Sequence, residues 1–459
     1  MILSLVRKLL MPNSENASQR SPLKKLIVKG SLWTIGGYGL AQLFRLASNV
    51  IMAKFLFPEA FGLMTLVMVF MQGISMFSDI GITPSIIQNK RGNDQIFLNT
   101  AWTIQVFRGF VLWAIALVGA YPYSILYNEP LLAWMLPVAS LSAIIAGFNS
   151  TSLASSNRDL NLRNITLLEL IAQFFSISVM ILWVVISPTV WGLVVGGLVN
   201  ALVKMLLSQF WIAKTRNRFQ WEREAASSLF KFGRWVLAST ALTFFARQID
   251  RILLGYLIGA ATLGVYSIAA MFKETASKTA QMLGSRVLFP SYSRLIREND
   301  HKRLYIALRK ARLFMIVMTW SVAIALITLG NQIIDWLYDA RYDDAIWMVK
   351  ILPLDLFIGV LSMTYHNVYL AKGKSSYISF LLFYQLIIQV TCILVGYNLA
   401  GTHGVVIGLA VVGWLLYPAN VIAAIRLKIW QPEIDIPVIA LAILFITAYL
   451  TLSDVLVSI

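Results

Sequence analysis

Charged side chains inside long apolar runs are the residues whose types and spacing could do chemistry in this chain. Arg247 and Arg251 are four residues apart and share one face of a helix, where Asp250 can partly neutralise Arg247. Glu274 and Lys278 have the same four-residue spacing. Once 27 inner-side and three outer-side bases are assigned to the flanks of the runs, eight bases remain within them and meet five acids, which leaves a surplus of three positive charges. The bases are Arg45, Arg108, Lys204, Arg234, Arg247, Arg251, Lys273 and Lys278, and the acids are Asp79, Glu169, Asp250, Glu274 and Asp355.

This surplus has two interpretations. Ion pairs between the runs would fasten helices together, and that structural interpretation stays open. The functional interpretation is that the surplus binds an anion such as a pyrophosphate, to which arginine offers a planar fork of donors and lysine a point charge. A charge costs about 2.5–3.5 kcal/mol at the bilayer centre, so we expect these bases to face a polar interior, except that Arg234 and Lys204 can snorkel. The expected substrate-binding cavity contains Arg45, Arg108, Arg247, Arg251, Lys273 and Lys278.

A second group of residues could couple transport to an ion or act as a gate. Asp355 follows Pro353 closely and precedes His366 by eleven residues, about three helical turns, so both side chains can share one face. One hypothesis makes Asp355 the carrier of a proton or sodium ion, and the alternative is a hydrogen-bonded polar patch. Asp79 lies near the end of its run, where a gate contact or a solvated helix end is expected. The candidates for coupling or gating are Asp355, His366, Asp79 and Glu274.

Signatures of enzyme chemistry are missing from the sequence. Gly373-Lys374-Ser375 lacks the earlier glycine of a nucleotide-binding loop, and no catalytic triad or paired-histidine motif is present. The three histidines are too scattered for a metal site, and the single cysteine, Cys392, sets no compartment. The sequence therefore predicts no cofactor, no metal and no enzymatic activity.

The composition identifies the elements that must position these charges. Of the 459 residues 58% are apolar and 13% charged, whereas soluble domains have about 45–50% and about 25%. A soluble enzyme is therefore excluded. The formal charge of +17 does not indicate nucleic acid, because the bases fall mostly between apolar runs of about 20 residues, the length that crosses a bilayer.

These runs predict an all-α membrane protein with about 13 transmembrane helices, within a range of 12–14. With the N-terminus in the cytoplasm, 27 of the 38 Lys and Arg residues lie on the inner side and three on the outer side, as the positive-inside rule requires. The expected spans are 30–53, 60–83, 98–121, 130–153, 165–187, 190–213, 231–256, 262–289, 306–330, 345–371, 377–399, 404–425 and 437–457.

An internal repeat groups the spans. A shift of 202 positions aligns Trp33 with Trp235, Arg45 with Arg247 and Gly62 with Gly264 without a gap. Spans 1–6 and 7–12 thus resemble two copies of one unit, related by an axis along the membrane normal. The expected division is a basic cytoplasmic segment 1–29, an N-lobe 30–213, a cytoplasmic linker 214–230, a C-lobe 231–425, and a linker with an extra helix 426–459.

Several soft motifs carry a resemblance to a known family. Gly30-Ser31-Leu32-Trp33, the segment Phe57-Pro58-Glu59-Ala60-Phe61-Gly62-Leu63, Phe77-Ser78-Asp79-Ile80-Gly81-Ile82 and Asp250-Arg251-Ile252-Leu253-Leu254-Gly255 are similar to the Wzx-type polysaccharide flippases. That family lies within the multidrug/oligosaccharidyl-lipid/polysaccharide exporter superfamily. The resemblance implies two six-helix lobes around a central cavity, and alternating access. Members commonly have fourteen spans, one more than we find, which leaves the side of the C-terminus open.

The function that the resemblance implies is translocation of a polyprenyl-pyrophosphate-linked oligosaccharide for O-antigen, capsule or exopolysaccharide synthesis. The expected location is the bacterial inner membrane, with membrane lipids, a polymerase and other assembly proteins as partners and no nucleic acid. Two alternatives remain. A multidrug exporter of the same superfamily would want an acidic cavity for organic cations, and a membrane-embedded enzyme of the pathway would need a catalytic carboxylate or base.

Overall fold

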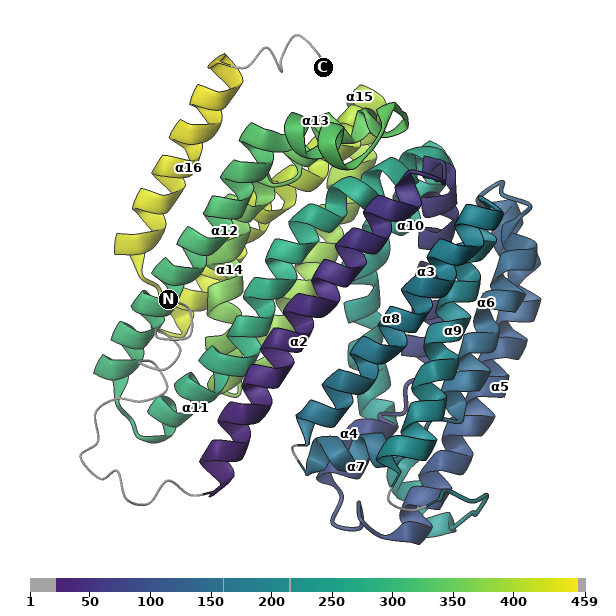
Figure 1. Ribbon diagram of the computed structural model, residues 1–459. Helices are drawn as coiled ribbons and strands as arrows, with labels where there is room; N and C mark the ends of the chain where they lie inside the picture. The colour runs from purple at the N-terminus through teal and green to yellow at the C-terminus, as the bar shows by residue number, and fades with distance from the viewer. Residues whose placement is uncertain (1–21, 160, 214–215, 453–459) are drawn as a thin grey trace. The chain divides into compact units, whose positions relative to one another are not determined.

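The computed structural model describes residues 22–159, 161–213 and 216–452 as helices joined by short turns, with no strand in those ranges (Figure 1). The all-α prediction is confirmed. Residues 1–21 of the expected basic segment, the end of the last expected span and the side chain of Arg234 lie outside the described residues. The main helices are α2 (Pro22–Ala53), α3 (Pro58–Phe77), α4 (Ile82–Gln88), α5 (Gln95–Leu126), α6 (Leu132–Gly147), α7 (Ser152–Arg158), α8 (Leu162–Ile186), α9 (Trp191–Leu207), α10 (Arg223–Leu283), α11 (Phe289–Arg297), α12 (His301–Leu337), α13 (Asp344–Ile351), α14 (Leu354–Ala371), α15 (Ser375–Arg426) and α16 (Pro432–Leu452).

Many of these helices are long and apolar enough to cross a membrane. Within the described residues nine helices meet that requirement, or ten if the bent pair α6 and α7 counts as one span. Two of these nine helices contain a break where the backbone leaves the helical conformation. The break in α10 lies at Gly259, whose φ is 77°, and the break in α15 lies at Ala400 and Gly401. The count of thirteen spans stays a prediction.

Helix starts follow local chemistry. The Asp94 carboxylate accepts the N–H of Ile96 before α5, and the Asp300 carboxylate accepts the N–H of Arg303 before α12. A side-chain acceptor at this position satisfies one of the free N–H groups of the first turn. Pro58 begins α3, where its missing N–H costs nothing.

The chain divides into two compact units, Ser18–Gly264 and Val265–Ile459, called here the N-terminal and the C-terminal unit. The first part of α10 belongs to the N-terminal unit, whereas the division expected from the sequence begins the C-lobe at residue 231. Within the N-terminal unit, α5 and α6 lie side by side (Figure 1). Gly109 allows their close approach, because a Cβ there would lie 2.7 Å from the carbonyl oxygen of Ala143.

A crossing of α3 and α10 places two glycines in reciprocal backbone contact. A Cβ on Gly62 would lie 1.8 Å from the carbonyl oxygen of Ala260, and a Cβ on Gly264 would lie 1.8 Å from that of Pro58. The two glycines are 202 residues apart, and so are Pro58 and Ala260. This interval is the shift of the sequence repeat. Only glycine fits at either position of this crossing.

An extended segment, 216–222, lies along the first turns of α5. The N–H groups of alternate residues Arg218, Gln220 and Glu222 donate to the side chains of Asn99, Thr103 and Thr100, respectively. An interval of two residues is the spacing of extended backbone, so all three N–H groups face the helix. The segment that leads into α10 is thus fixed to the N-terminal unit.

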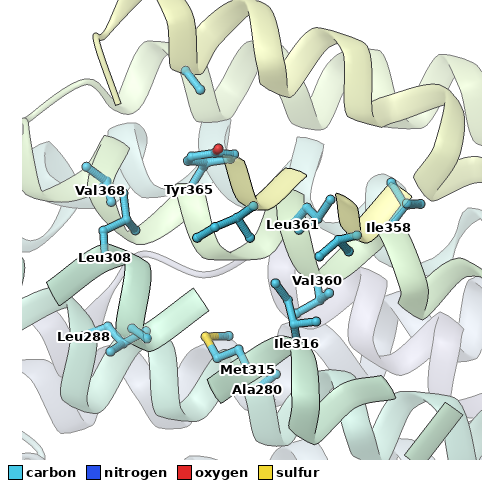
Figure 2. Close-up of a cluster of buried hydrophobic side chains, with 14 of the residues drawn as sticks. Ala280, Leu288, Leu308, Met315, Ile316, Ile358, Val360, Leu361, Tyr365 and Val368 are labelled. Carbon is cyan, nitrogen blue, oxygen red and sulfur yellow. The ribbon is translucent and has the colours of Figure 1, made fainter. Parts of the chain in front are cut away.

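The C-terminal unit has an apolar core between α12 and α14, to which α16 also contributes. Figure 2 shows part of this core, in which Leu308, Met315 and Ile316 of α12 and Leu361 and Val368 of α14 are labelled.

A charged cluster also lies inside this unit. Arg312 on α12 and Asp435 on α16 are both fully buried and form an ion pair. The Asp435 carboxylate also accepts hydrogen bonds from the hydroxyls of Tyr365 and Tyr417 at 2.9 and 2.8 Å. This network fastens α16 to the unit.

Candidate functional site

The bases expected in a cationic cavity fall into three groups, and the first group is paired with acids. Lys273 Nζ lies 2.7 Å from the Asp355 carboxylate, and Lys278 Nζ lies 2.7 Å from that of Glu274. Lys204, which we expected to snorkel, lies 3.6 Å from Glu169. Direct partners reduce the positive charge that these lysines can offer to a ligand.

The second group is held by uncharged polar atoms. Arg108 on α5 reaches α3, where Nε donates to Ser78 Oγ at 3.0 Å and Nη2 donates to the carbonyl oxygen of Ser75 at 2.6 Å. The hydrogen bonds of Arg108 orient its guanidinium without neutralising its charge. Arg251 donates to the Gln248 side chain one turn earlier on α10.

The third group consists of Arg45 on α2 and Arg247 on α10, the pair related by the repeat. Both side chains are exposed at the protein surface. Neither guanidinium has an ion-pair or hydrogen-bond partner in the part of the chain that the structure describes. No ion pair within the described residues therefore neutralises these two positive charges.

Asp355 on α14 links three helices of the C-terminal unit. Besides the ion pair with Lys273 on α10, its Oδ1 accepts the N–H of Gly413 on α15 at 2.7 Å. An alanine at position 413 would place its Cβ 2.3 Å from this oxygen, so the glycine allows the contact. His366, the other member of the expected patch, is exposed on α14.

The remaining candidates for coupling or gating have local partners. The Asp79 carboxylate accepts the N–H of Gly81 at 2.8 Å. The chain turns here between α3 and α4, and the φ of Gly81 is 63°. Glu274 lies one turn before Lys278 and forms the ion pair that their spacing allows. In the described residues no group of three or more His, Cys, Asp or Glu side chains could hold a metal ion.

A cavity of about 540 Å³ lies inside the N-terminal unit between α3 and α9. Four charged side chains line it, two acidic (Asp79 and Glu169) and two basic (Arg108 and Lys204). Amides and hydroxyls complete its polar lining, among them Gln105, Asn149, Asn157, Ser142 and Thr151. Of the six bases expected to bind substrate, this cavity contains Arg108.

Sequence patterns do not identify the buried pair of Arg312 and Asp435. They place Arg312 among the 27 inner-side bases, but its side chain is fully buried within α12. Asp435 is not among the candidate residues. One further base and one further acid leave the surplus of three positive charges unchanged. The sequence feature that could have indicated this pair is one arginine and one aspartate, each next to an apolar run.

Comparison with known sequences gives a family and a relative. The family profile described as "Polysaccharide biosynthesis protein" matches residues 51–347. The "Lipopolysaccharide biosynthesis protein WzxC" of Escherichia coli K12 is 21% identical over 398 residues, which cover 85% of this chain and 79% of the relative.

Comparison with solved structures identifies the fold. The lipid II flippase MurJ in an inward closed conformation has a TM-score of 0.71 and 14% identity, with 92% of each chain covered. An inward-facing multidrug resistance transporter of the MATE family has a TM-score of 0.67 and 15% identity, with 85% of this chain and 94% of that chain covered. The all-helical fold is therefore shared with membrane transporters.

Proposed function

The chain belongs to the polysaccharide biosynthesis protein family, and from this premise we propose that it is a flippase for a lipid-linked oligosaccharide. The cargo is a saccharide joined through pyrophosphate to a polyprenyl chain, destined for O-antigen, capsule or exopolysaccharide. The protein lies in the bacterial cytoplasmic membrane with its N-terminus in the cytoplasm. It works beside a polymerase and other assembly proteins, and it moves the cargo without changing its covalent structure.

The observation that carries this proposal is the pair Arg45 and Arg247. They are equivalent in the repeat, exposed, and without an ion-pair partner among the described residues. An unpaired arginine in a membrane helix is costly unless it faces water or an anion. A pyrophosphate can receive the planar donor fork of each guanidinium, while the polyprenyl chain stays in lipid. Exchange between inward- and outward-open states then carries the bound anion across.

Charge reversal tests this site. In a strain whose own gene is deleted, Arg45→Glu and Arg247→Glu should each lower surface polysaccharide at least tenfold at unchanged protein level. Arg247→Lys keeps the charge and should retain most export. Arg303→Glu, at an exposed base near the start of α12, is the matched control and should export normally. Normal export by both charge-reversed variants would remove the proposed anion site.

The driving ion is a separate part of the proposal, with Asp355 as its carrier. In proteoliposomes, Asp355→Asn should abolish the response of transport to a pH gradient. Lys273→Met is the matched variant, because it breaks the same ion pair but keeps the carboxylate. An unchanged gradient response in Asp355→Asn would assign the pair a structural role alone.

A multidrug exporter is the second candidate, favoured by the structural likeness to the multidrug transporter. Its cargo would be an organic cation, for which the surplus of positive charge in the membrane helices is unfavourable. Expression in a drug-sensitive strain distinguishes the two functions. The flippase leaves the tolerated concentration of ethidium unchanged, whereas a severalfold rise would favour the exporter.

A further inference from the structure

We propose that the cavity of the N-terminal unit binds a sugar ring of the cargo, an uncharged group with several hydroxyls. This inference rests on the proposed flippase function and adds a second subsite to it. The cavity volume of about 540 Å³ falls within the range of about 300–1,000 Å³ in which proteins bind small molecules.

The lining of this cavity has no net charge. Arg108 and Lys204 are balanced by Asp79 and Glu169. A pyrophosphate would meet two carboxylates here, and an organic cation would meet two bases. In addition, no aromatic ring is among the described residues that line the cavity, so an organic cation could form no cation–π contact with them. Both kinds of charged ligand are therefore disfavoured.

The polar groups of the lining can both donate and accept hydrogen bonds, as sugar hydroxyls do. Asn149 Oδ1 is buried and has no partner among the described residues. Arg108 uses Nε and Nη2 on α3, whereas Nη1 makes no hydrogen bond within the described part of the chain. A buried acceptor and a half-buried donor with spare capacity favour a ligand that supplies both partners.

The walls of the cavity are fixed before a ligand enters. Gln105 Nε2 donates to the carbonyl oxygens of Ala146, Gly147 and Asn149, which ties α5 to the end of α6. The lining residues come from the end of α3, the first half of α5, the end of α6, the start of α8 and the end of α9, together with the short helices α4 and α7. In the expected orientation these ends lie on the cytoplasmic side, from which the cargo enters.

Thiol protection tests the site directly. With Cys392→Ser as background, Ser142→Cys places a single thiol in the lining, and Ser375→Cys places one at the exposed start of α15. The probe is the lipid-free repeat oligosaccharide released from the host polysaccharide by mild acid. It should slow maleimide labelling at position 142 at least fivefold and leave position 375 unchanged. Inorganic pyrophosphate should protect neither position, and absence of protection by the oligosaccharide overturns the inference.

Filling the cavity gives an independent test on the intact transporter. Ser142→Leu should raise the cargo concentration needed for half-maximal flipping at least tenfold, whereas Ser142→Ala should stay within twofold of the wild type. Wild-type kinetics in a folded Ser142→Leu protein would overturn the subsite. If Arg247→Glu still abolishes export in that case, the flippase proposal stands without the sugar subsite. If the Arg45 and Arg247 variants also export normally, the proposed function fails as well.

Discussion

Lys273 on α10 and Asp355 on α14 form an ion pair of 2.7 Å, and the same carboxylate accepts the N–H of Gly413 on α15. The two charged side chains are 21% and 18% exposed, so water screens the pair only in part. Within the C-terminal unit, one carboxylate thus connects three helices that are distant in sequence.

Removal of either partner of this pair should destabilise the protein. Lys273→Met leaves a carboxylate without its counter-ion, and Asp355→Asn leaves an ammonium, so each should cost about 1–3 kcal/mol, less than for a fully buried pair. The double variant should recover part of the loss, because no charge is then left alone. Thermal unfolding in detergent measures the cycle, and strictly additive losses would contradict a direct interaction.

Arg312→Met should be more damaging than any change at the surface of α12. It leaves the Asp435 carboxylate buried without its counter-ion, which costs about 3–5 kcal/mol in such sites. Adding Asp435→Asn removes the stranded charge and should restore part of the stability. Arg303→Met, which breaks an exposed pair with Asp300, is the control and should change stability by less than about 1 kcal/mol. Equal losses in the two single variants would contradict the buried network.

Gly62→Ala and Gly264→Ala should each destabilise the crossing of α3 and α10 by about 1–3 kcal/mol, since the new Cβ meets a backbone carbonyl rather than a movable side chain. The control is Gly197→Ala on α9, where a Cβ has nothing within 4 Å. That substitution should be neutral or stabilise the helix by up to about 1 kcal/mol. Unfolding temperatures of the three variants measure these effects. An unchanged unfolding temperature in Gly62→Ala would show that the two helices can move apart at no cost.

Thr103→Val should weaken the attachment of the segment 216–222 to α5, because valine keeps the shape of the threonine side chain but lacks its hydroxyl. The Thr103 hydroxyl accepts the N–H of Gln220 at 3.0 Å, and its own proton lies between the carbonyl oxygens of Asn99 at 2.9 Å and Gln220 at 3.1 Å. Each lost bond is worth about 1 kcal/mol, so tryptic cleavage after Arg218 should accelerate about fivefold or more. Thr328→Val, which removes a hydroxyl that donates to the Ile324 carbonyl oxygen of its own helix, should leave the cleavage rate unchanged. Mass spectrometry of the fragments locates the cut.

Acid should weaken the turn before α5 through Asp94. Its hydrogen bond with Arg91, and then that with the N–H of Ile96, lower the pKa of Asp94 below its ordinary value of 3.8. A lowered pKa stabilises the fold above pH 3.8, and this contribution is lost as the pH falls through the folded-state pKa. Arg91→Met should therefore flatten the acid side of a plot of unfolding temperature against pH. Arg426→Met, at an exposed arginine, should leave that plot unchanged.

The sequence allowed the helices and the short-range pairs to be predicted. Apolar runs of membrane length determined where helices form, and the four-residue spacing of Glu274 and Lys278 determined an ion pair that the structure contains. Both follow from the helical repeat alone, without knowledge of how helices pack.

Pairing across the fold was beyond the sequence. Helices that are apolar on every side carry no periodic signal of which face is buried, so the partner of Lys273, 82 positions away at Asp355, could not be identified. For the same reason the burial of Arg312 could not be predicted. The availability of Arg45 and Arg247 is likewise visible only once the partners of the other bases are known.

The reciprocal contact of Gly62 and Gly264 has the form of an interface between two copies of one subunit, in which each copy presents the same residue to the other. In a symmetric dimer a single codon would specify both sides of such a crossing. In this chain each glycine is encoded separately, yet a side chain at either position separates the same two backbones. Two independent mutations can therefore damage this one contact.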